Sequence, residues 1–154
     1  MRILIVAVGR LKERHWREAA EEYLKRLKPY ATIEMIEVPD RDVSADEPKA
    51  LKAEAEGILR ALPEAAHVVV LEPGGTQRSS EAFAAWMELA GVEGRSTIAF
   101  VVGGAAGLDA SVLTRANERL SLGPMTFPHQ LARVVMLEQI YRGFRIIRGE
   151  PYHR

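Results

Sequence analysis

The hydrophobic positions of the chain form short continuous runs separated by stretches with helical spacing, and most runs end at glycine or proline. Residues 3–8, 67–72 and 97–102 are largely apolar, which is typical of strands buried on both faces of a parallel sheet. Residues 33–38 alternate apolar side chains with glutamates, which predicts a strand exposed on one side.

Between these runs, apolar residues recur every three or four positions and predict helices. The predicted helices are residues 13–28, residues 49–62, a segment capped by Ser79-Ser80-Glu81 and a segment that begins at Asp109 or Ser111. The third should turn Phe83, Trp86, Met87 and Leu89 inward. Because strands and helices alternate, the sequence predicts an α/β fold with a mostly parallel sheet flanked by helices. No repeat or linker interrupts the pattern, so residues 1–154 are expected to form a single domain.

The stretch from residue 120 to residue 144 has a different organisation. It begins as a short strand-like piece, breaks at Gly123-Pro124 and resumes as a helix opened by Pro128, where the missing N–H of proline costs nothing. Between the breaks lie Met125, Thr126 and Phe127. Such a loop exposes backbone amides and carbonyls beside an apolar wall, and it is suited to a flat ligand with polar edges.

Ligands of α/β sheets bind beyond the carboxyl ends of the strands. Three predicted ends have suitable residues, at positions 71–74, at Gly103-Gly104 and at positions 122–127. The dinucleotide fingerprint G-x-G-x-x-G is absent because Val102 occupies the place of its first glycine, and no P-loop pattern occurs. The two adjacent glycines are equally compatible with a ligand site and with a plain tight turn.

Composition narrows the possible classes of function. The 21 lysines and arginines balance 21 aspartates and glutamates, so no overall field attracts nucleic acid or membrane. Five arginines against two glutamates after residue 127 nevertheless indicate a local basic face. The absence of cysteine excludes thiolate chemistry, and the four histidines lack metal-ligand spacing, so no metal is expected. Without a signal-peptide pattern or a run of about 20 apolar residues, a cytoplasmic location with no membrane partner is expected.

The last residues of the chain combine unusual chemistry. Tyr152, His153 and Arg154 offer a ring for stacking, a proton-transfer group and an anion-binding fork. A frayed tail is the alternative. In the preceding helix, Glu138 and Arg142 are four residues apart and form either a surface pair or a buried pair at a subunit contact. His129 lies in the first turn of that helix, whose positive end disfavours the protonated imidazole.

Several segments resemble a known family. These are VVGGAAGL at 101–108, LSLGPMTFPHQLARVVMLEQIYRGFRI at 120–146, the closing PYHR, and, near the start, AVGRLKERHW and IEVPD. They are similar to the ribosomal RNA large subunit methyltransferase H (RlmH) family of the SPOUT superfamily. The resemblance covers essentially the whole chain, and the T-F-P-H-Q-x-x-R-V-V run together with the terminal Y-H-R is its most specific part.

The resemblance implies a SPOUT-type α/β fold with a C-terminal trefoil knot, a homodimer, and S-adenosylmethionine bound within the knot. By motif position the cofactor contacts fall on Leu71, Gly103, Leu122, Gly123, Pro124, Met125, Thr126 and Phe127. These belong to the three strand ends chosen above on physical grounds.

The implied reaction is methylation of N3 of a pseudouridine in helix 69 of 23S rRNA, on assembled ribosomes. His153 is then expected to transfer a proton or position the base, and Tyr152 to stack on or orient it. Arg142 and Arg154 are expected to hold phosphate or the developing negative charge. Two alternatives remain open: a knotted methyltransferase acting on another RNA position, and a non-catalytic factor that binds the ribosome.

Overall fold

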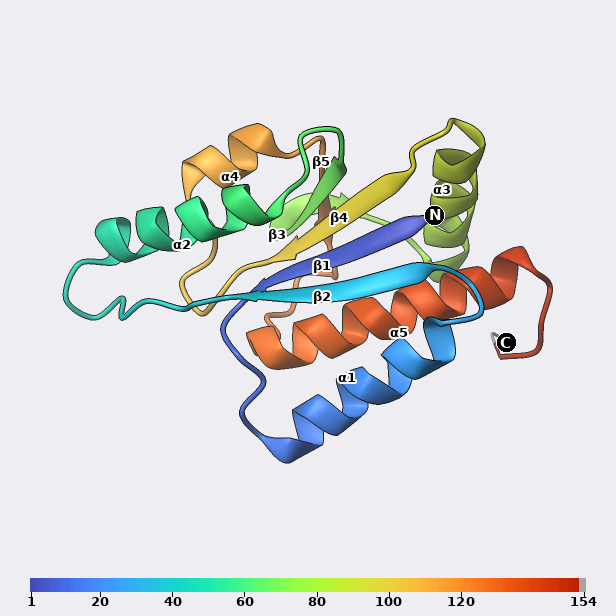
Figure 1. Cartoon of the computed structure of the whole chain (residues 1–154), viewed down its shortest axis with the longest axis horizontal. Coiled ribbons are helices and arrows are strands. Elements are labelled where there is room, and N and C mark those ends of the chain that lie inside the picture. The colour runs from blue at the N-terminus through green and yellow to red at the C-terminus, as the bar shows by residue number, and fades with distance from the viewer. Residues whose placement is uncertain (153–154) are drawn as a thin grey trace.

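The computed structural model of the chain describes residues 1–152, in which five parallel strands form one sheet covered by helices on both faces (Figure 1). The strand order is β2-β1-β4-β3-β5. The strands are β1 (Arg2–Val8), β2 (Thr32–Val38), β3 (His67–Gln77), β4 (Thr97–Val102) and β5 (Glu118–Ser121). The helices are α1 (Arg14–Leu27), α2 (Glu47–Ala61), α3 (Ser80–Val92), α4 (Ala110–Arg115) and α5 (His129–Ile147). The predicted α/β class and parallel sheet are confirmed, and the implied knot stays a prediction.

Helices α2, α3 and α4 begin where side-chain oxygens can accept hydrogen bonds from otherwise unpaired backbone amides. Asp46 accepts from the amide of Lys49, and Ser79 Oγ accepts from the amide of Ala82 at 3.0 Å. Asp109, one of the two starts proposed for the fourth helix, caps it by accepting from Ser111. The local signals in the sequence therefore locate these helix starts to within about two residues.

Two apolar clusters fill the spaces on the two faces of the sheet. Alternate residues of β1 enter opposite clusters, with Ile3 and Ile5 in one and Leu4 and Val6 in the other. The first cluster packs the sheet against α1, α3 and α5, and the second packs it against α2 and α4. Every residue of β1 after Arg2 is buried, as its uninterrupted apolar run predicts.

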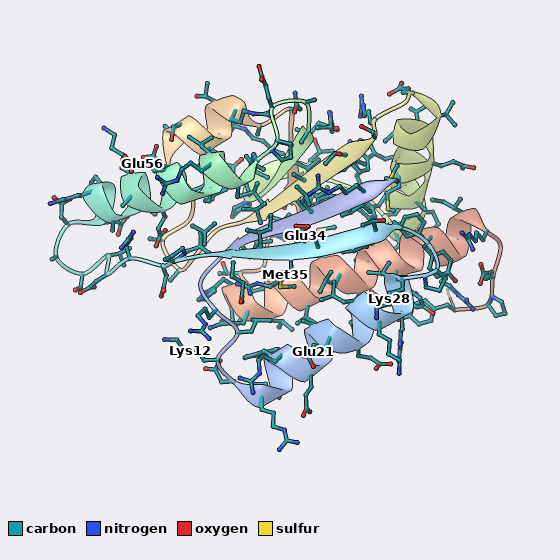
Figure 2. The ribbon with its side chains drawn as sticks, viewed as in Figure 1. Lys12, Glu21, Lys28, Glu34, Met35 and Glu56 are labelled. Atoms are coloured by element: carbon teal, nitrogen blue, oxygen red, sulfur yellow. The ribbon has the colours of Figure 1, made fainter. Side chains whose placement is uncertain are left out.

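Charged side chains cover the outside of these layers. Lys12, Glu21 and Lys28 are exposed in and around α1, and Glu56 is exposed on α2 (Figure 2). Within residues 1–152, every helix is too short or too polar to cross a membrane.

The prediction was wrong for two details. Strand β3 does not end at Pro73: after an irregularity its pairing with β5 resumes at Thr76, opposite Leu120. Gly75 permits this close approach, because a Cβ there would lie 2.7 Å from the carbonyl carbon of Arg119. Leu89, expected to point inward, is 54% exposed. It lies two positions after the buried Met87, which places it about 200° around the helix on the opposite side.

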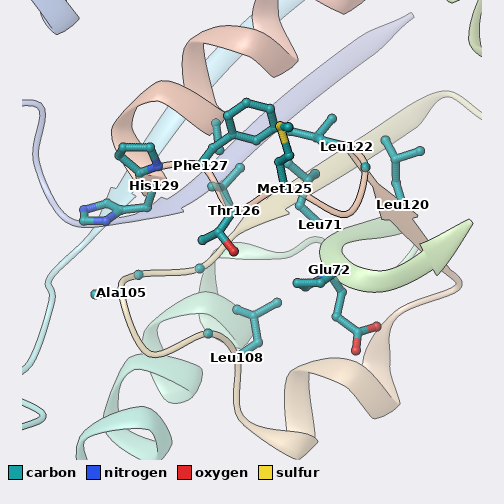
Figure 3. Close-up of a pocket in the computed structure, with 18 of the residues that line it drawn as sticks. Leu71, Glu72, Ala105, Leu108, Leu120, Leu122, Met125, Thr126, Phe127 and His129 are labelled. Carbon is teal, nitrogen blue, oxygen red and sulfur yellow. The ribbon is translucent and has the colours of Figure 1, made fainter. Parts of the chain in front are cut away.

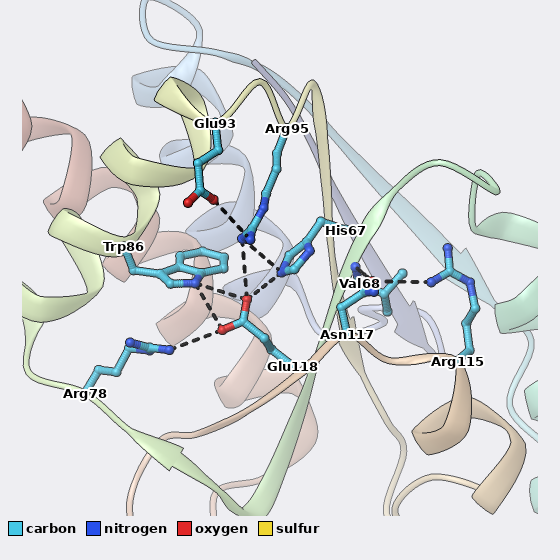
Figure 4. A network of polar contacts seen from close by, with 9 residues as sticks. All are labelled: His67, Val68, Arg78, Trp86, Glu93, Arg95, Arg115, Asn117 and Glu118. Atoms are coloured by element: carbon cyan, nitrogen blue, oxygen red, sulfur yellow. Dashed lines mark hydrogen bonds and ion pairs between the residues drawn. The ribbon is translucent and has the colours of Figure 1, made fainter.

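A polar network fastens the short edge strand β5 to its neighbours (Figure 4). The Glu118 carboxylate accepts from Trp86 Nε1 at 3.1 Å and pairs with Arg78 at 3.2 Å, and it lies 2.5 Å from His67 Nε2. Next to it, Asn117 Oδ1 accepts from the amide of Val68 at 2.8 Å. These contacts fix the strand that leads directly into the loop at 122–128.

The packing of α2 on the sheet can be tested at Gly57, which lies in α2. Gly91, which lies in α3, serves as the control. A Cβ at Gly57 would lie 2.5 Å from Cγ1 of Val38, a stiff side chain that is itself buried. Gly57→Ala should therefore lower the free energy of unfolding by about 1–3 kcal/mol. At Gly91 the nearest atom is Met1 Cε at 3.4 Å, so Gly91→Ala should be neutral or stabilise by up to about 1 kcal/mol. Urea denaturation of both variants checks this, and equal effects would contradict it.

Candidate active site

A cavity of about 750 Å³ opens at the carboxyl ends of β4 and β5, beside the irregularity in β3 (Figure 3). Its volume is typical of sites for small molecules and cofactors. Three segments far apart in the sequence form most of its wall, at residues 71–73, 102–108 and 120–132, and Leu113 of α4 completes it. Most of the wall is apolar and is made by Leu71, Leu108, Leu113, Leu120, Leu122 and Phe127.

The glycine-rich segment after β4 turns back on itself and forms one side of the cavity. The amide of Gly107 donates to the carbonyl of Gly104 at 3.2 Å, and Gly107 has a φ of 87°, which favours glycine. A Cβ on Gly103 would lie 2.9 Å from the carbonyl oxygen of Gly107. Gly103-Gly104 were compatible with a ligand site or with a tight turn. The two interpretations do not exclude each other, because the tight turn also forms part of the cavity wall.

The loop between β5 and α5 forms the opposite side. Ser121 Oγ accepts from the amide of Gly123 at 3.1 Å, and Gly123 has a φ of 118°. Among the described residues, the backbone groups of residues 124–127 make no hydrogen bond with one another or with other segments. They are therefore available to a ligand, and the Thr126 hydroxyl also points into the cavity (Figure 3).

Two ionisable side chains line the cavity. The Glu72 carboxylate is 29% exposed and lies 3.4 Å from Arg119 Nη1. His129 is half-buried, and burial, assisted by the positive charge of Arg133, lowers its pKa below the usual value. The direction agrees with the prediction from the helix dipole, although burial is the main cause. The cavity therefore presents one carboxylate and one largely neutral imidazole at neutral pH.

The structure brings together nearly all the positions predicted to contact a cofactor. Leu71, Gly103 and five residues of the 122–127 loop lie on the cavity wall, and Pro124 belongs to that loop but not to the wall. Leu108 and His129 also line the cavity, although neither was among the predicted cofactor contacts. Their nearness to predicted residues was the available signal, since both directly follow segments at strand ends.

A second cluster lies on the C-terminal half of α5. The Tyr152 hydroxyl donates to Glu138 Oε2 at 3.0 Å, and the Arg142 guanidinium lies 4.6 Å from the centre of the Tyr152 ring. Arg142 also pairs with Glu138 at 3.2 Å, and the two side chains are 25% and 18% exposed. The Tyr141 ring meets that of Tyr152 edge-on at 4.9 Å. Burial and the bond to Glu138 raise the pKa of Tyr152, so its phenol stays protonated.

This cluster and the cavity lie at opposite ends of α5. His129 in the first turn lines the cavity, and Arg142 follows 13 residues later, a rise of about 20 Å along the axis. The structure therefore brings Arg142 and Tyr152 together but does not bring them to the cavity of the same chain. The other two predicted catalytic residues, His153 and Arg154, lie outside the described residues.

The comparisons with known proteins assign the chain to a family. A family model described as "Predicted SPOUT methyltransferase" matches residues 1–153, so the chain belongs to the SPOUT methyltransferase family. Its relatives include proteins named "Ribosomal RNA large subunit methyltransferase H" from Clostridium beijerinckii, 46% identical, and Listeria monocytogenes, 47% identical. Another protein of that name, from Symbiobacterium thermophilum, is 47% identical. All three alignments cover 100% of both chains. The resemblance noted in the sequence is confirmed.

The environment of His129 predicts its titration. Because its pKa is lowered in the folded state, the unfolded chain binds a proton more readily, and stability should fall as the pH drops below about 6.5. His129→Gln should flatten this part of the pH dependence. NMR titration of the imidazole, assigned from the signal lost in the variant, checks the direction. A His129 pKa at or above 6.5 would contradict the interpretation.

Proposed function

We propose that this chain transfers a methyl group from S-adenosylmethionine to N3 of a pseudouridine in helix 69 of 23S rRNA, within the assembled ribosome. The observation that carries the proposal is the cavity wall, which is built from the three segments that the resemblance assigns to the cofactor. End-to-end similarity to proteins named for ribosomal RNA methylation supports the choice of substrate, and a ribosomal substrate implies a cytoplasmic location.

The residues of the cavity fit this cofactor. Leucine side chains and Phe127 provide an apolar surface for a flat adenine ring, and the free backbone groups of residues 124–127 suit its polar edge. The Glu72 carboxylate also lies at the wall, where it is paired with Arg119. S-adenosylmethionine, when bound, supplies a methyl group activated by a sulfonium, so the main task of the protein is to align donor and acceptor.

The acceptor requires further help, because N3 of the base carries a proton and is a poor nucleophile until that proton leaves. We assign proton transfer or base positioning to His153. The protonated phenol of Tyr152 is unsuited to act as a base, which agrees with a role in stacking on or orienting the nucleobase. Arg142 and Arg154 are proposed to stabilise phosphate or the negative charge that develops on the ring.

A homodimer would unite the two parts of the site. In one chain the cavity and Tyr152 lie at opposite ends of α5. A second copy packed against α5 would allow the tail of one chain to approach the cavity of the other. This arrangement is part of the proposal, and mixing inactive variants tests it. A chain with a defective cavity and a chain with a deleted tail should restore activity together if the tail acts across the dimer.

Gly103→Ala tests the cofactor site. The new methyl group would lie 2.9 Å from the Gly107 carbonyl, so the turn must shift and the wall must change shape. The Kd for S-adenosylmethionine should rise roughly 10-fold or more. Calorimetry measures this, with Gly91→Ala as a matched control far from the cavity. Unchanged affinity in the Gly103 variant would contradict the assignment, and no binding to the unmodified protein would favour a non-catalytic ribosome-binding factor.

Changes in the tail test the residues proposed to act on the nucleobase. Deleting residues 152–154 should lower methylation of ribosomes roughly 100-fold or more, because proton transfer and base positioning are both lost. His153→Ala should remove a large share of this activity while leaving cofactor affinity unchanged. Mass-spectrometric mapping of 23S rRNA from a strain lacking the enzyme, before and after adding the protein, identifies the nucleotide. Wild-type rates in both variants, or modification elsewhere, would contradict the proposal.

A further inference from the structure

Arg145 binds the residues that precede the tail. Its Nη1 donates to Glu150 Oε2 at 2.5 Å and to the Tyr30 hydroxyl at 2.9 Å, and its Nη2 donates to the Pro151 carbonyl at 2.6 Å. The Tyr30 hydroxyl in turn donates to Glu150 Oε2 at 2.9 Å. One guanidinium therefore joins α5, the segment after α1 and the start of the tail. Tyr30, Arg145 and Glu150 are called the tail clamp below.

The backbone at the end of α5 makes this contact possible. Gly149 has a φ of 64°, a conformation that favours glycine, and its amide donates to the carbonyl of Ile146 at 3.0 Å. The amide of Glu150 donates to the carbonyl of Arg145 at 2.9 Å. This pair of bonds is the Schellman motif that ends many helices. It reverses the chain, so Glu150 and Pro151 return along α5 instead of continuing into solvent.

Tyr30 is held in place independently of the tail. Its ring stacks on Phe144 at 5.5 Å between centres and meets Tyr141 edge-on at 6.0 Å. Arg148 lies over the same ring, 4.5 Å from its centre. The hydroxyl that contacts Arg145 and Glu150 is consequently fixed by packing on α5, which makes it a rigid support for the clamp.

We propose that Arg145, with Tyr30 and Glu150, is a positioning residue for methyl transfer, because the clamp sets the point from which the tail departs. This inference rests on the proposed function, in which the tail handles the nucleobase. Two residues after Glu150, Tyr152 reaches Glu138 on the same helix, so residues 150–152 are bound to α5 at two places. Both proton transfer and base orientation depend on such placement, and a misplacement of about 1 Å costs up to roughly 100-fold in rate.

The partial exposure of the clamp side chains indicates that the clamp positions the tail more than it stabilises the fold. The Arg145 and Glu150 side chains are 21% and 32% exposed, and ion pairs that reach solvent contribute little to folding. The clamp also lies at the end of α5 remote from the cavity. Breaking it should therefore change turnover much more than the melting temperature or cofactor affinity.

The geometry specifies the test. Arg145→Gln removes the charge and the fork, whereas Arg145→Lys keeps the charge but has a single nitrogen for acceptors that now use two. We expect kcat for methylation of ribosomes to fall roughly 10- to 100-fold in the glutamine variant and less in the lysine variant. The Kd for S-adenosylmethionine should stay within about twofold, because no cavity residue changes. Arg2→Gln is the matched control: it also removes the charge of a paired arginine, 3.6 Å from Glu34, but it lies on β1 and outside the clamp.

The decisive measurement combines Arg145→Gln with deletion of residues 152–154. If the clamp acts through the tail, the substitution has no further effect once the tail is gone. An equal fractional loss in both backgrounds, or full activity of the glutamine variant, would overturn the clamp while leaving the role of the tail intact. Full activity after the deletion alone would overturn the role of the tail and the clamp with it. Should the glutamine variant melt much lower, Glu150→Gln, which keeps an acceptor oxygen, repeats the comparison and should show a smaller loss.

Discussion

The buried guanidinium of Arg133 is the interaction on which the arrangement of the molecule depends. Its side chain is 1% exposed, and its Nη1 donates to Glu37 Oε2 at 2.7 Å. Its Nη2 donates to the carbonyls of Val8 and Gly9, at 3.2 and 2.9 Å. Burial lowers the pKa of this arginine, and an unpaired charge there would be strongly destabilising. The chain therefore folds with α5 set against the carboxyl ends of β1 and β2.

The position of α5 determines both ends of the candidate site. Its first turn carries His129 at the cavity, and Arg133 follows one turn later. The helix is then anchored in the core by Met136, Leu137 and Ile140. This close packing keeps α5 rigid as far as the clamp at Arg145. The cavity loop at 122–128 and residues 150–152 are consequently placed by one element rather than by two independent loops. A shift of α5 would disturb both together.

The sequence predicted the loops that line the cavity, because their signals are local. Continuous apolar runs indicated parallel strands, and glycine or proline marked strand ends where ligands of such sheets bind. The arginine count after residue 127 was a poorer guide to a basic face, since the sequence indicated a partner for Arg142 in Glu138 but none for Arg133 or Arg145. In the structure Arg133, Arg142 and Arg145 are paired with Glu37, Glu138 and Glu150. Two of these partners lie nearby in sequence, but Glu37 comes from β2, and only the fold brings it to α5.

The sequence pointed to the tail, residues 152–154, but not to the clamp that precedes it, because only the tail has a local signal. Tyrosine, histidine and arginine at consecutive positions indicate chemistry through composition alone. The clamp requires Tyr30, which is 115 residues from Arg145 in sequence, and a reversal at Gly149 that returns the chain to α5. Under the proposed function, α5 thus separates two tasks along its length. Its N-terminal end borders the site for the methyl donor, and its C-terminal end holds the group that meets the base. A catalytic site built from both ends needs a second chain, so dimerisation would be a condition of the chemistry rather than an addition to it.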